Sequence, residues 1–271
     1  RVSPNYPPVV DAGDDVKICL GETVSFDASR TQISGSPKYV WNFGDGETAE
    51  GMRVTHTYQK PGTYRVLLSA DDGKGTECST GQDTLTVWVM DRVTISSVEG
   101  PSSACTGQTV SFQANGSGGG KYTWDFGDGT TWSGGSAASH SYQKGGKYNV
   151  TVTADNGQGS ACSTATSGTS IMINSRPIAD AGDNVMACVG ATAVFDASGS
   201  SDPEGDALTY HWDFGDGTTG EGMKVNHAYD KIGHYRVTLT VKDSSGGDCG
   251  VSGDSVSATV NAKPEAVIGV R

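Results

Sequence analysis

Six cysteines are the residues in this sequence that could form covalent cross-links, and they recur at a regular spacing. Consecutive members of each pair lie about 60 residues apart, and no Cys-x-x-Cys motif of a zinc or thiol-exchange site occurs. Since one pair falls in each of three sequence repeats, we predict one disulfide within each repeat. The predicted pairs are Cys19–Cys78, Cys105–Cys162 and Cys188–Cys249. Disulfides persist in oxidising compartments, so we expect an extracellular, cell-surface or periplasmic location.

Two kinds of titratable residue also recur once in each repeat. One is the aspartate of a Phe-Gly-Asp-Gly motif, and the other is the histidine of a His-x-Tyr motif. These residues are Asp45, Asp128 and Asp216, and His56, His140 and His227. A glycosidase needs two carboxylates at a defined separation. We therefore interpret each Asp-Gly pair as a hairpin turn and each histidine as a hydrogen-bonded, half-buried side chain. No Gly-x-Ser-x-Gly, His-Glu-x-x-His or P-loop motif is present, so we predict that the chain is not an enzyme.

Trp132 is the aromatic side chain that is a candidate for ligand contact. It follows the second Phe-Gly-Asp-Gly turn, where the other repeats carry Ala49 and Gly220. A tryptophan in a turn can stack on a sugar ring or on an aromatic group of a partner, and it can equally cover its own sheet. For Trp88, in the last predicted strand of the first repeat, we expect a place in the core.

The elements that position these residues repeat three times in a fixed order. Tyr-x-Trp-Asn/Asp-Phe-Gly-Asp-Gly occurs at residues 39–46, 122–129 and 210–217, and each copy is followed by His-x-Tyr and then Gly-x-Tyr. We predict modules at residues 1–90, 91–173 and 174–260. Residues 261–271 resemble a module start, so we expect the beginning of a truncated fourth module there.

Each repeat has the pattern of short strands. Segments of alternating polar and apolar residues, such as residues 23–27 and 38–43, are separated by turn-forming residues, and no helical period occurs. This pattern predicts an all-β fold of three tandem immunoglobulin-like sandwiches, with about seven strands each. Trp41 is expected in the core, and Tyr64 of the Gly-x-Tyr motif is expected to form a tyrosine corner. The linkers are very short, so we expect the modules to lie end to end.

The net charge of the chain limits the kinds of partner that it is expected to bind. It carries 19 basic and 31 acidic side chains, for a formal net charge of −12. No basic stripe is available to neutralise phosphate, so we expect no nucleic-acid partner. No apolar run is long enough to span a bilayer, so we expect no direct membrane span in this segment.

The three motifs together resemble the polycystic-kidney-disease (PKD) domain, and the resemblance covers nearly the whole chain three times. The third repeat matches best, because residues 195–206 read Phe-Asp-Ala-Ser-Gly-Ser-Ser-Asp-Pro-Glu-Gly-Asp before its Trp212 motif. The resemblance implies an immunoglobulin-like sandwich of a bacterial or archaeal surface or secreted protein. Such domains commonly serve as spacers, adhesion modules or accessories of secreted hydrolases. Paired cysteines are not part of the common family pattern.

The resemblance also implies a calcium (Ca²⁺) site near the start of the third module, since some members bind calcium there. Calcium takes about six to eight oxygen ligands. Mapped onto this sequence, the ligands would be Asn174, the carbonyl of Ser175, Asp202, Glu204 or Asp206, and Asp243. The alternative is that these side chains only cap loop backbone as Asx turns.

In the first module the equivalent loop, residues 29–34, has no carboxylate, and Arg30 could place a positive charge where calcium would lie. The second module lacks the acidic loop. We therefore expect calcium in the third module alone.

These observations favour a non-catalytic extracellular spacer or structural array. It would mediate surface display, adhesion or assembly through contacts with other surface proteins or with copies of itself. The alternative is a set of accessory modules of a larger secreted hydrolase, binding a polysaccharide or a fibrous protein such as collagen.

Overall fold

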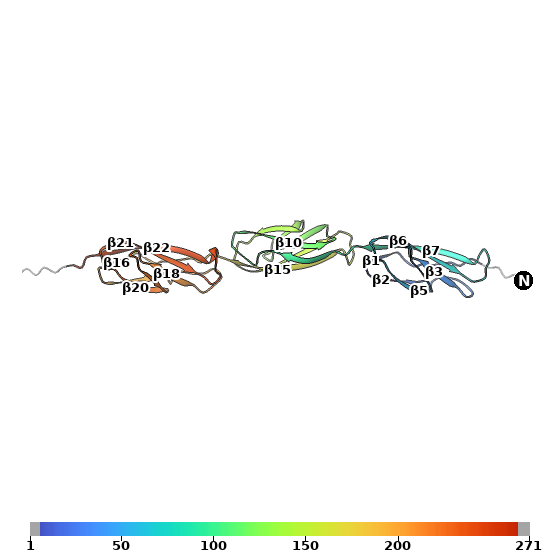
Figure 1. Ribbon diagram of the computed structural model, residues 1–271, viewed down its shortest axis with the longest axis horizontal. Helices are drawn as coiled ribbons and strands as arrows, with labels where there is room; N and C mark the ends of the chain where they lie inside the picture. The colour runs from blue at the N-terminus through green and yellow to red at the C-terminus, as the bar shows by residue number, and fades with distance from the viewer. Residues whose placement is uncertain (1–5, 265–271) are drawn as a thin grey trace, which may run out of the picture.

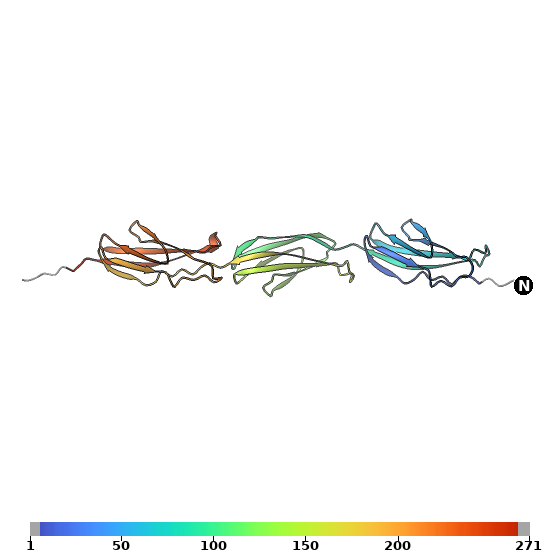
Figure 2. The same ribbon diagram turned by 90° about the horizontal axis from the view of Figure 1, so that it is seen from below.

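The computed structural model describes residues 6–264, which form three β-sandwich modules in one straight row (Figures 1 and 2). Within these residues, no helix has the length and apolar character needed to cross a membrane. The predicted fourth-module start lies mostly outside the described residues, which end at residue 264. We call the end of a module that faces the N-terminus of the chain its N-terminal pole, and the other end its C-terminal pole.

Module 1 has a five-stranded sheet in the order β1-β7-β6-β3-β4, packed against the two-stranded sheet β2-β5. Its strands are β1 (Val16–Cys19), β2 (Thr23–Asp27), β3 (Lys38–Asn42), β4 (Thr48–Glu50), β5 (Arg53–Thr57), β6 (Gly62–Asp71) and β7 (Thr80–Met90). The pair β1/β7 is parallel, with Cys19 opposite Met90, whereas the other strand pairs of module 1 are antiparallel.

Module 2 repeats this plan with one more strand. Its strands are β8 (Thr94–Glu99), β9 (Ser103–Cys105), β10 (Thr109–Ser117), β11 (Lys121–Asp125), β12 (Thr131–Gly134), β13 (Ala137–Ser141), β14 (Gly146–Asp155) and β15 (Thr164–Asn174). The sheets have the orders β12-β11-β14-β15-β9 and β13-β10-β8. β10 continues to Ser117 and pairs with β8, so this module has strand where module 3 has its acidic loop.

Module 3 returns to the plan of module 1, with sheets β16-β22-β21-β18-β19 and β17-β20. Its elements are β16 (Val185–Cys188), β17 (Thr192–Asp196), β18 (Thr209–Asp213), β19 (Thr219–Glu221), β20 (Lys224–Ala228), β21 (Gly233–Lys242), the 3₁₀ turn η1 (Asp248–Gly250) and β22 (Val251–Asn261). The predicted all-β fold, with about seven strands in each of three immunoglobulin-like modules, is confirmed.

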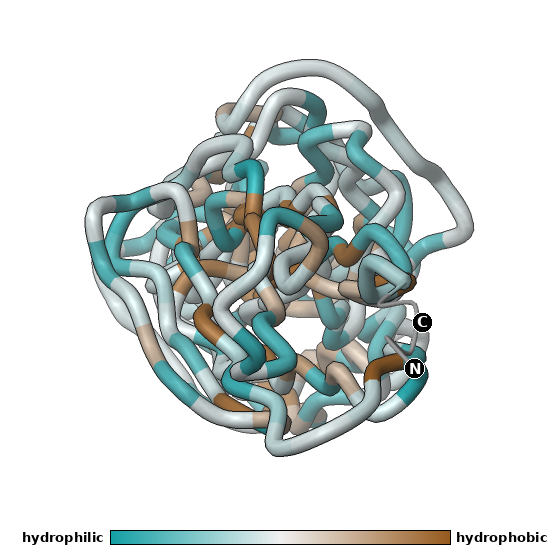
Figure 3. Tube along the Cα trace, turned by 90° about the vertical axis from the view of Figure 1, so that its right-hand side faces the viewer, coloured by the Kyte–Doolittle hydropathy of each residue, from teal (hydrophilic) through white to brown (hydrophobic). Residues whose placement is uncertain are grey.

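The alternating strands fold this way because each places one row of apolar side chains inward. β2 and β3 both alternate exposed and buried residues. Trp41 of β3 is fully buried against Phe26, which also packs on Phe43. Trp124 and Trp212 are buried in the same way in their own modules. Viewed along the row, apolar residues gather toward the interior (Figure 3). The core position expected for Trp41 is confirmed.

Two tyrosines in each module tie loops to the sandwich. In module 1 the hydroxyl of Tyr64 donates to the carbonyl of Lys60 at 3.0 Å, which is the predicted tyrosine corner. The buried Tyr58 donates to the carbonyl of Phe43 at 3.1 Å, which anchors the Phe-Gly-Asp-Gly turn to the core. Modules 2 and 3 repeat both bonds through Tyr148 and Tyr142, and through Tyr235 and Tyr229.

Candidate functional site

Disulfides join neighbouring modules, so the predicted pairing within modules is wrong. Cys19 at the end of β1 bonds Cys162 in the β14–β15 loop of module 2, with Cα atoms 5.6 Å apart. Cys105 at the end of β9 bonds Cys249 in η1 of module 3, with Cα atoms 5.5 Å apart. Each bond therefore links the C-terminal pole of one module to the N-terminal pole of the next.

The strand topology explains why pairing within a module fails. β1 runs parallel to β7 and ends beside Met90, so Cys19 lies at the C-terminal pole. Cys78 lies in the loop that begins β7, at the opposite pole. A strand of 11 residues such as β7 spans about 35 Å, whereas disulfide-bonded Cα atoms lie within about 7 Å. The regular cysteine spacing is equally compatible with bonds between neighbouring modules. The parallel pairing of the first strand with the last strand of a module is the signal that distinguishes bonds between modules from bonds within a module.

Further contacts accompany the disulfide at the first junction. The amide of Val93 donates to the carbonyl of Cys162 at 2.9 Å, and Val93 itself is buried. Arg92 Nη2 lies 3.5 Å from Glu22 Oε1, which joins the linker to module 1. The linker is therefore fixed to both modules.

The second junction is closed by the linker and by a side chain of module 3. Arg176 Nη2 donates to the carbonyl of Asp248 at 3.1 Å. Gly145 of module 2 lies directly against the carboxylate of Glu204, so that a Cβ at residue 145 would collide with Glu204 Oε1. The side chain of Glu204 thus touches the backbone of module 2 at Gly145, in addition to the disulfide.

The acidic residues of module 3 converge at this same junction. Asp202, Asp206 and Asp243 each offer a carboxylate oxygen, and the three oxygens lie within 4.8 Å of one another. Asp202 Oδ1 accepts from the amides of Glu204 at 2.9 Å and Asp206 at 3.1 Å. The Asx-turn alternative therefore accounts for one of the two carboxylate oxygens of Asp202. Asp202 Oδ2 is buried and has no hydrogen-bond partner within the described residues. A buried carboxylate oxygen without a donor is unfavourable unless a cation compensates for the lost hydration.

The other predicted ligands surround this trio. Asn174 Nδ2 donates to Asp243 Oδ2 at 2.9 Å, to the carbonyl of Ser175 at 2.9 Å and to the carbonyl of Cys249 at 3.2 Å. Glu204 instead accepts from the amide of Ser175 at 2.9 Å, on the side facing module 2. Burial raises the pKa of Asp243, but hydrogen bonds from Ser245 and Asn174 outweigh it, so the net pKa is lowered and the carboxylate form is favoured.

Modules 1 and 2 treat the equivalent position differently. Asp72 takes the place of Asp243 in module 1, and Lys74 Nζ lies 3.4 Å from its Oδ2. The predicted positive charge is therefore supplied by Lys74. Arg30, which we expected there, instead contacts Asp11 at 3.3 Å and Asp14 at 3.7 Å. In module 2 the equivalent residue is the uncharged Asn156. Module 3 alone combines acidic side chains there without a lysine two residues on.

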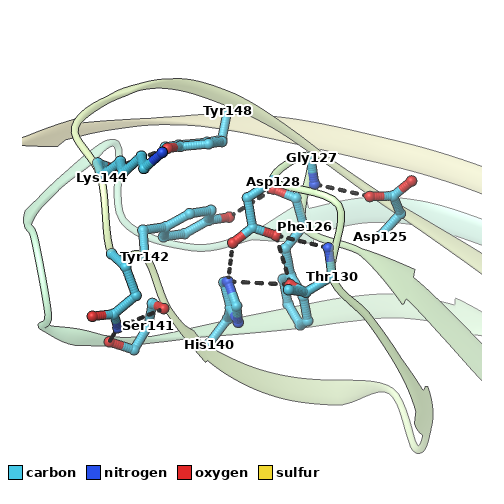
Figure 4. A network of polar contacts seen from close by, with 11 residues as sticks. Asp125, Phe126, Gly127, Asp128, Thr130, His140, Ser141, Tyr142, Lys144 and Tyr148 are labelled. Atoms are coloured by element: carbon cyan, nitrogen blue, oxygen red, sulfur yellow. Dashed lines mark hydrogen bonds and ion pairs between the residues drawn. The ribbon is translucent and has the colours of Figure 1, made fainter.

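The recurrent aspartates and histidines form one pair in each module. In module 2, His140 Nε2 lies 2.7 Å from Asp128 Oδ2 and stacks on Phe126 with ring centroids 4.2 Å apart (Figure 4). Asp128 also accepts from the amide and hydroxyl of Thr130. Modules 1 and 3 repeat the pair at 2.7 Å through His56–Asp45 and His227–Asp216. The sequence indicated both residues separately, and only the fold brings the turn onto the histidine strand.

The aspartate–histidine pairs make the stability of the modules depend on pH. Burial raises the pKa of Asp216, but hydrogen bonds from Thr218 and His227 outweigh it and lower the net pKa. A lowered folded pKa contributes stability above the unfolded value of about 3.9, and this is lost as pH falls through the folded pKa. We expect Asp216→Asn to lower the free energy of unfolding by about 1–2 kcal/mol at pH 6 and by less at pH 3. Denaturant unfolding at both pH values measures this, with the exposed Asp230→Asn as control. An equal loss at both pH values would contradict it.

The two tryptophans outside the cores occupy different surfaces. Trp132 lies on the edge strand β12 opposite Trp124, is 40% exposed, and its ring rests over Gly134. Trp88 is half-buried on the outer face of β7, with Lys17 Nζ 5.8 Å from its ring centroid, so the expected core position is wrong.

An open groove of about 750 Å³ runs beside Trp88 at the first junction. Module 1 contributes Pro61, Met90 and Lys17, among others, and module 2 contributes Gln158. The disulfide-bonded junction therefore completes a surface that neither module has alone.

Comparison with known proteins identifies the modules. The family described as PKD domain matches residues 5–87, 94–171 and 174–259. Collagenase ColA of Clostridium perfringens (strain 13 / Type A) is 38% identical over 79 residues, which are 29% of this chain and 7% of that protein. Polycystin-1 of Homo sapiens is 33% identical over 122 residues, which are 42% of this chain and 3% of that protein. The chain thus spans less than a tenth of either relative.

Among solved structures, an E-to-A variant of titin domains I67–I69 has a TM-score of 0.56 at 14% identity. The match covers 96% of this chain and 99% of the titin chain. At this identity the likeness concerns the fold alone, namely three immunoglobulin-like domains in tandem.

Proposed function

Because this chain belongs to the PKD-domain family, we propose that it is a stiff, non-catalytic extracellular spacer that holds other parts of a surface or secreted protein at a distance. The observation that carries this proposal is the pair of disulfides between modules. A flexible display arm needs only a linker, whereas a covalent bond beside each linker restricts bending at both junctions. Disulfides also require an oxidising location, which we assign to the cell surface, the periplasm or the medium.

The stiffness of the chain tests this function directly. We expect small-angle X-ray scattering of the oxidised protein to fit one straight conformation. A variant with Cys19, Cys162, Cys105 and Cys249 all replaced by serine should give a broad distribution of shapes, because short linkers alone permit hinge motion. Near-ultraviolet circular dichroism checks that the modules of the variant stay folded. Identical scattering from the two proteins would rule out the disulfides as the stiffening element.

We propose that Asp202, Asp206 and Asp243 hold a calcium ion, with Asn174, the Ser175 carbonyl and Glu204 as further oxygen donors close by. The partnerless Oδ2 of Asp202 supports this assignment, since hard cations such as Ca²⁺ prefer carboxylate and carbonyl oxygen. Asn174 connects the site to the carbonyl of Cys249, so an ion there would stiffen the same junction as the second disulfide.

A second candidate role is contact with a fibrous partner in a secreted hydrolase. The curated relatives include collagenases of Clostridium perfringens and Vibrio alginolyticus. The groove beside Trp88 and the exposed face of Trp132 are surfaces that could contact collagen or polysaccharide. The spacer remains the first proposal, because the junction disulfides serve it directly.

A further inference from the structure

Two cysteines within residues 6–264 are not in disulfides, and each is equivalent to cysteines that are. Cys78 is exposed in the β6–β7 loop of module 1, six residues after Asp72. Cys162 and Cys249, which both bond the preceding module, follow Asn156 and Asp243 by the same interval. Cys78 thus holds, in module 1, the position through which modules 2 and 3 are each bonded to the preceding module.

Cys188 is the equivalent of Cys19 and Cys105, the cysteines that bond the following module. It ends the parallel strand β16 opposite Asn261, as Cys19 ends β1 opposite Met90 and Cys105 ends β9 opposite Asn174. In all three modules the next amide donates to the carbonyl of that opposite residue at 2.9 Å. The backbone that presents Cys188, which is partly exposed, is therefore the same as at the two bonded cysteines.

The surface around Cys188 provides an independent observation. At the first junction, the groove beside module 2 is lined by Pro61, Gly62, Thr63 and residues 88–91 of module 1. The C-terminal pole of module 3 has a hollow of about 360 Å³ lined by Ile232, Gly233, His234 and residues 259–262. These are the same positions of the fold, since Gly62 pairs with Val89 as Gly233 pairs with Val260.

One of these positions also contacts the next module at the second junction. Gly145, the equivalent of Pro61 and Ile232, lies against Glu204 of module 3. In module 3 the position is held by Ile232, an isoleucine with 64% of its surface exposed. An apolar side chain at a position that faces the next module in both other copies indicates a surface made for a further module.

The two cysteines lie at opposite ends of the row, Cys78 in the β6–β7 loop and Cys188 at the end of β16 (Figure 1). They cannot bond within one straight chain. We propose that they are the two halves of a third junction, in which Cys188 of one copy bonds Cys78 of a second copy, head to tail. Such a contact joins unlike surfaces and does not close on itself in a straight rod, so the chain of residues 1–271 by itself forms open, head-to-tail oligomers. This goes beyond the spacer role, which needs the two inner junctions alone.

The bond forms by thiol–disulfide exchange with an oxidant such as glutathione disulfide. One cysteine thiolate attacks this disulfide, forms a mixed disulfide and releases one glutathione thiolate. The thiolate of the other protein copy then attacks the mixed disulfide at the protein sulfur and releases the second glutathione thiolate. The two cysteine thiols thus lose two protons and two electrons, and glutathione disulfide is reduced to two thiols.

Two single variants of the full chain separate a specific junction from random thiol coupling. Cys78→Ser leaves Cys188 and Cys188→Ser leaves Cys78, and neither touches the inner disulfides. With glutathione disulfide as oxidant, we expect the mixture to form covalent dimers about tenfold faster than either variant alone. Mass spectrometry of unreduced peptides should identify the Cys188–Cys78 link, and the wild type should form a ladder of oligomers.

A surface variant provides the matched control. Ile232→Glu on the Cys78→Ser chain should lower the rate of mixed dimer formation about tenfold, whereas Val194→Glu, at a similarly exposed site on β17, should leave it unchanged. Mixed and symmetric dimers forming at equal rates would overturn the proposal, because they would show that exposed thiols react without a docking surface. A mixture that forms no covalent dimer would overturn it as well.

Discussion

Replacing Cys105 and Cys249 together by serine is expected to lower the free energy of unfolding by about 4 kcal/mol. The two residues are separated by 144 positions, and a bond that closes so long a loop removes much conformational freedom from the unfolded chain. The bond restricts the chain whichever of its two modules unfolds. Denaturant unfolding followed by tryptophan fluorescence measures the change, because each module has one fully buried tryptophan.

The control for this prediction is Cys78→Ser. Cys78 is exposed and outside both disulfides, so its replacement should change the free energy of unfolding by less than about 0.5 kcal/mol. If the double variant and this control unfolded at the same denaturant concentration, the bond between modules would contribute orientation and no stability. The double variant keeps Cys19–Cys162, so any loss belongs to the second junction.

The second large expected effect concerns Asp202→Asn, which should be more stable than the wild type without calcium and less stable than the wild type with calcium. In calcium-free buffer, Asp202→Asn is expected to stabilise the chain by about 1 kcal/mol, since it removes one of three carboxylate charges within 4.8 Å. In calcium at about 100 times the dissociation constant, the wild type should gain about 2.7 kcal/mol, and the variant much less. Thermal unfolding with and without calcium, at matched ionic strength, measures both differences.

Asp72→Asn in module 1 is the matched control for the calcium prediction. Asp72 holds the position of Asp243, but Lys74 lies against it. Its replacement should leave the calcium response of the chain intact. Equal gains in wild type and Asp202→Asn would contradict the calcium site and leave the Asx-turn description of the loop.

The two predictions concern one place in the molecule. The second disulfide, the acidic trio and the contact of Glu204 with Gly145 all lie between modules 2 and 3. Asn174 joins them, because it ends β15 and donates to both Asp243 and Cys249. Calcium and oxidation are therefore expected to stiffen this junction together, whereas the first junction depends on its disulfide and the Arg92–Glu22 pair.

The sequence by itself determined what depends on near neighbours in the chain. Alternating residues such as those of β2 and β3 predict strands and an inward Trp41, because side chains of a strand point to opposite faces. The Asp-Gly turns and the tyrosine corner at Tyr64 follow from short motifs with local hydrogen bonds. Recurrence of these motifs also determined the number of modules.

The tertiary structure decided what depends on which end of a module a residue reaches. Regular cysteine spacing fits bonds within or between modules, and only the parallel pairing of β1 with β7 carries Cys19 to the pole that faces Cys162. Likewise, Trp88 was expected inside, but its neighbours Val87 and Val89 take the inward positions of β7. Such contacts are made through space between elements, and no local pattern encodes them.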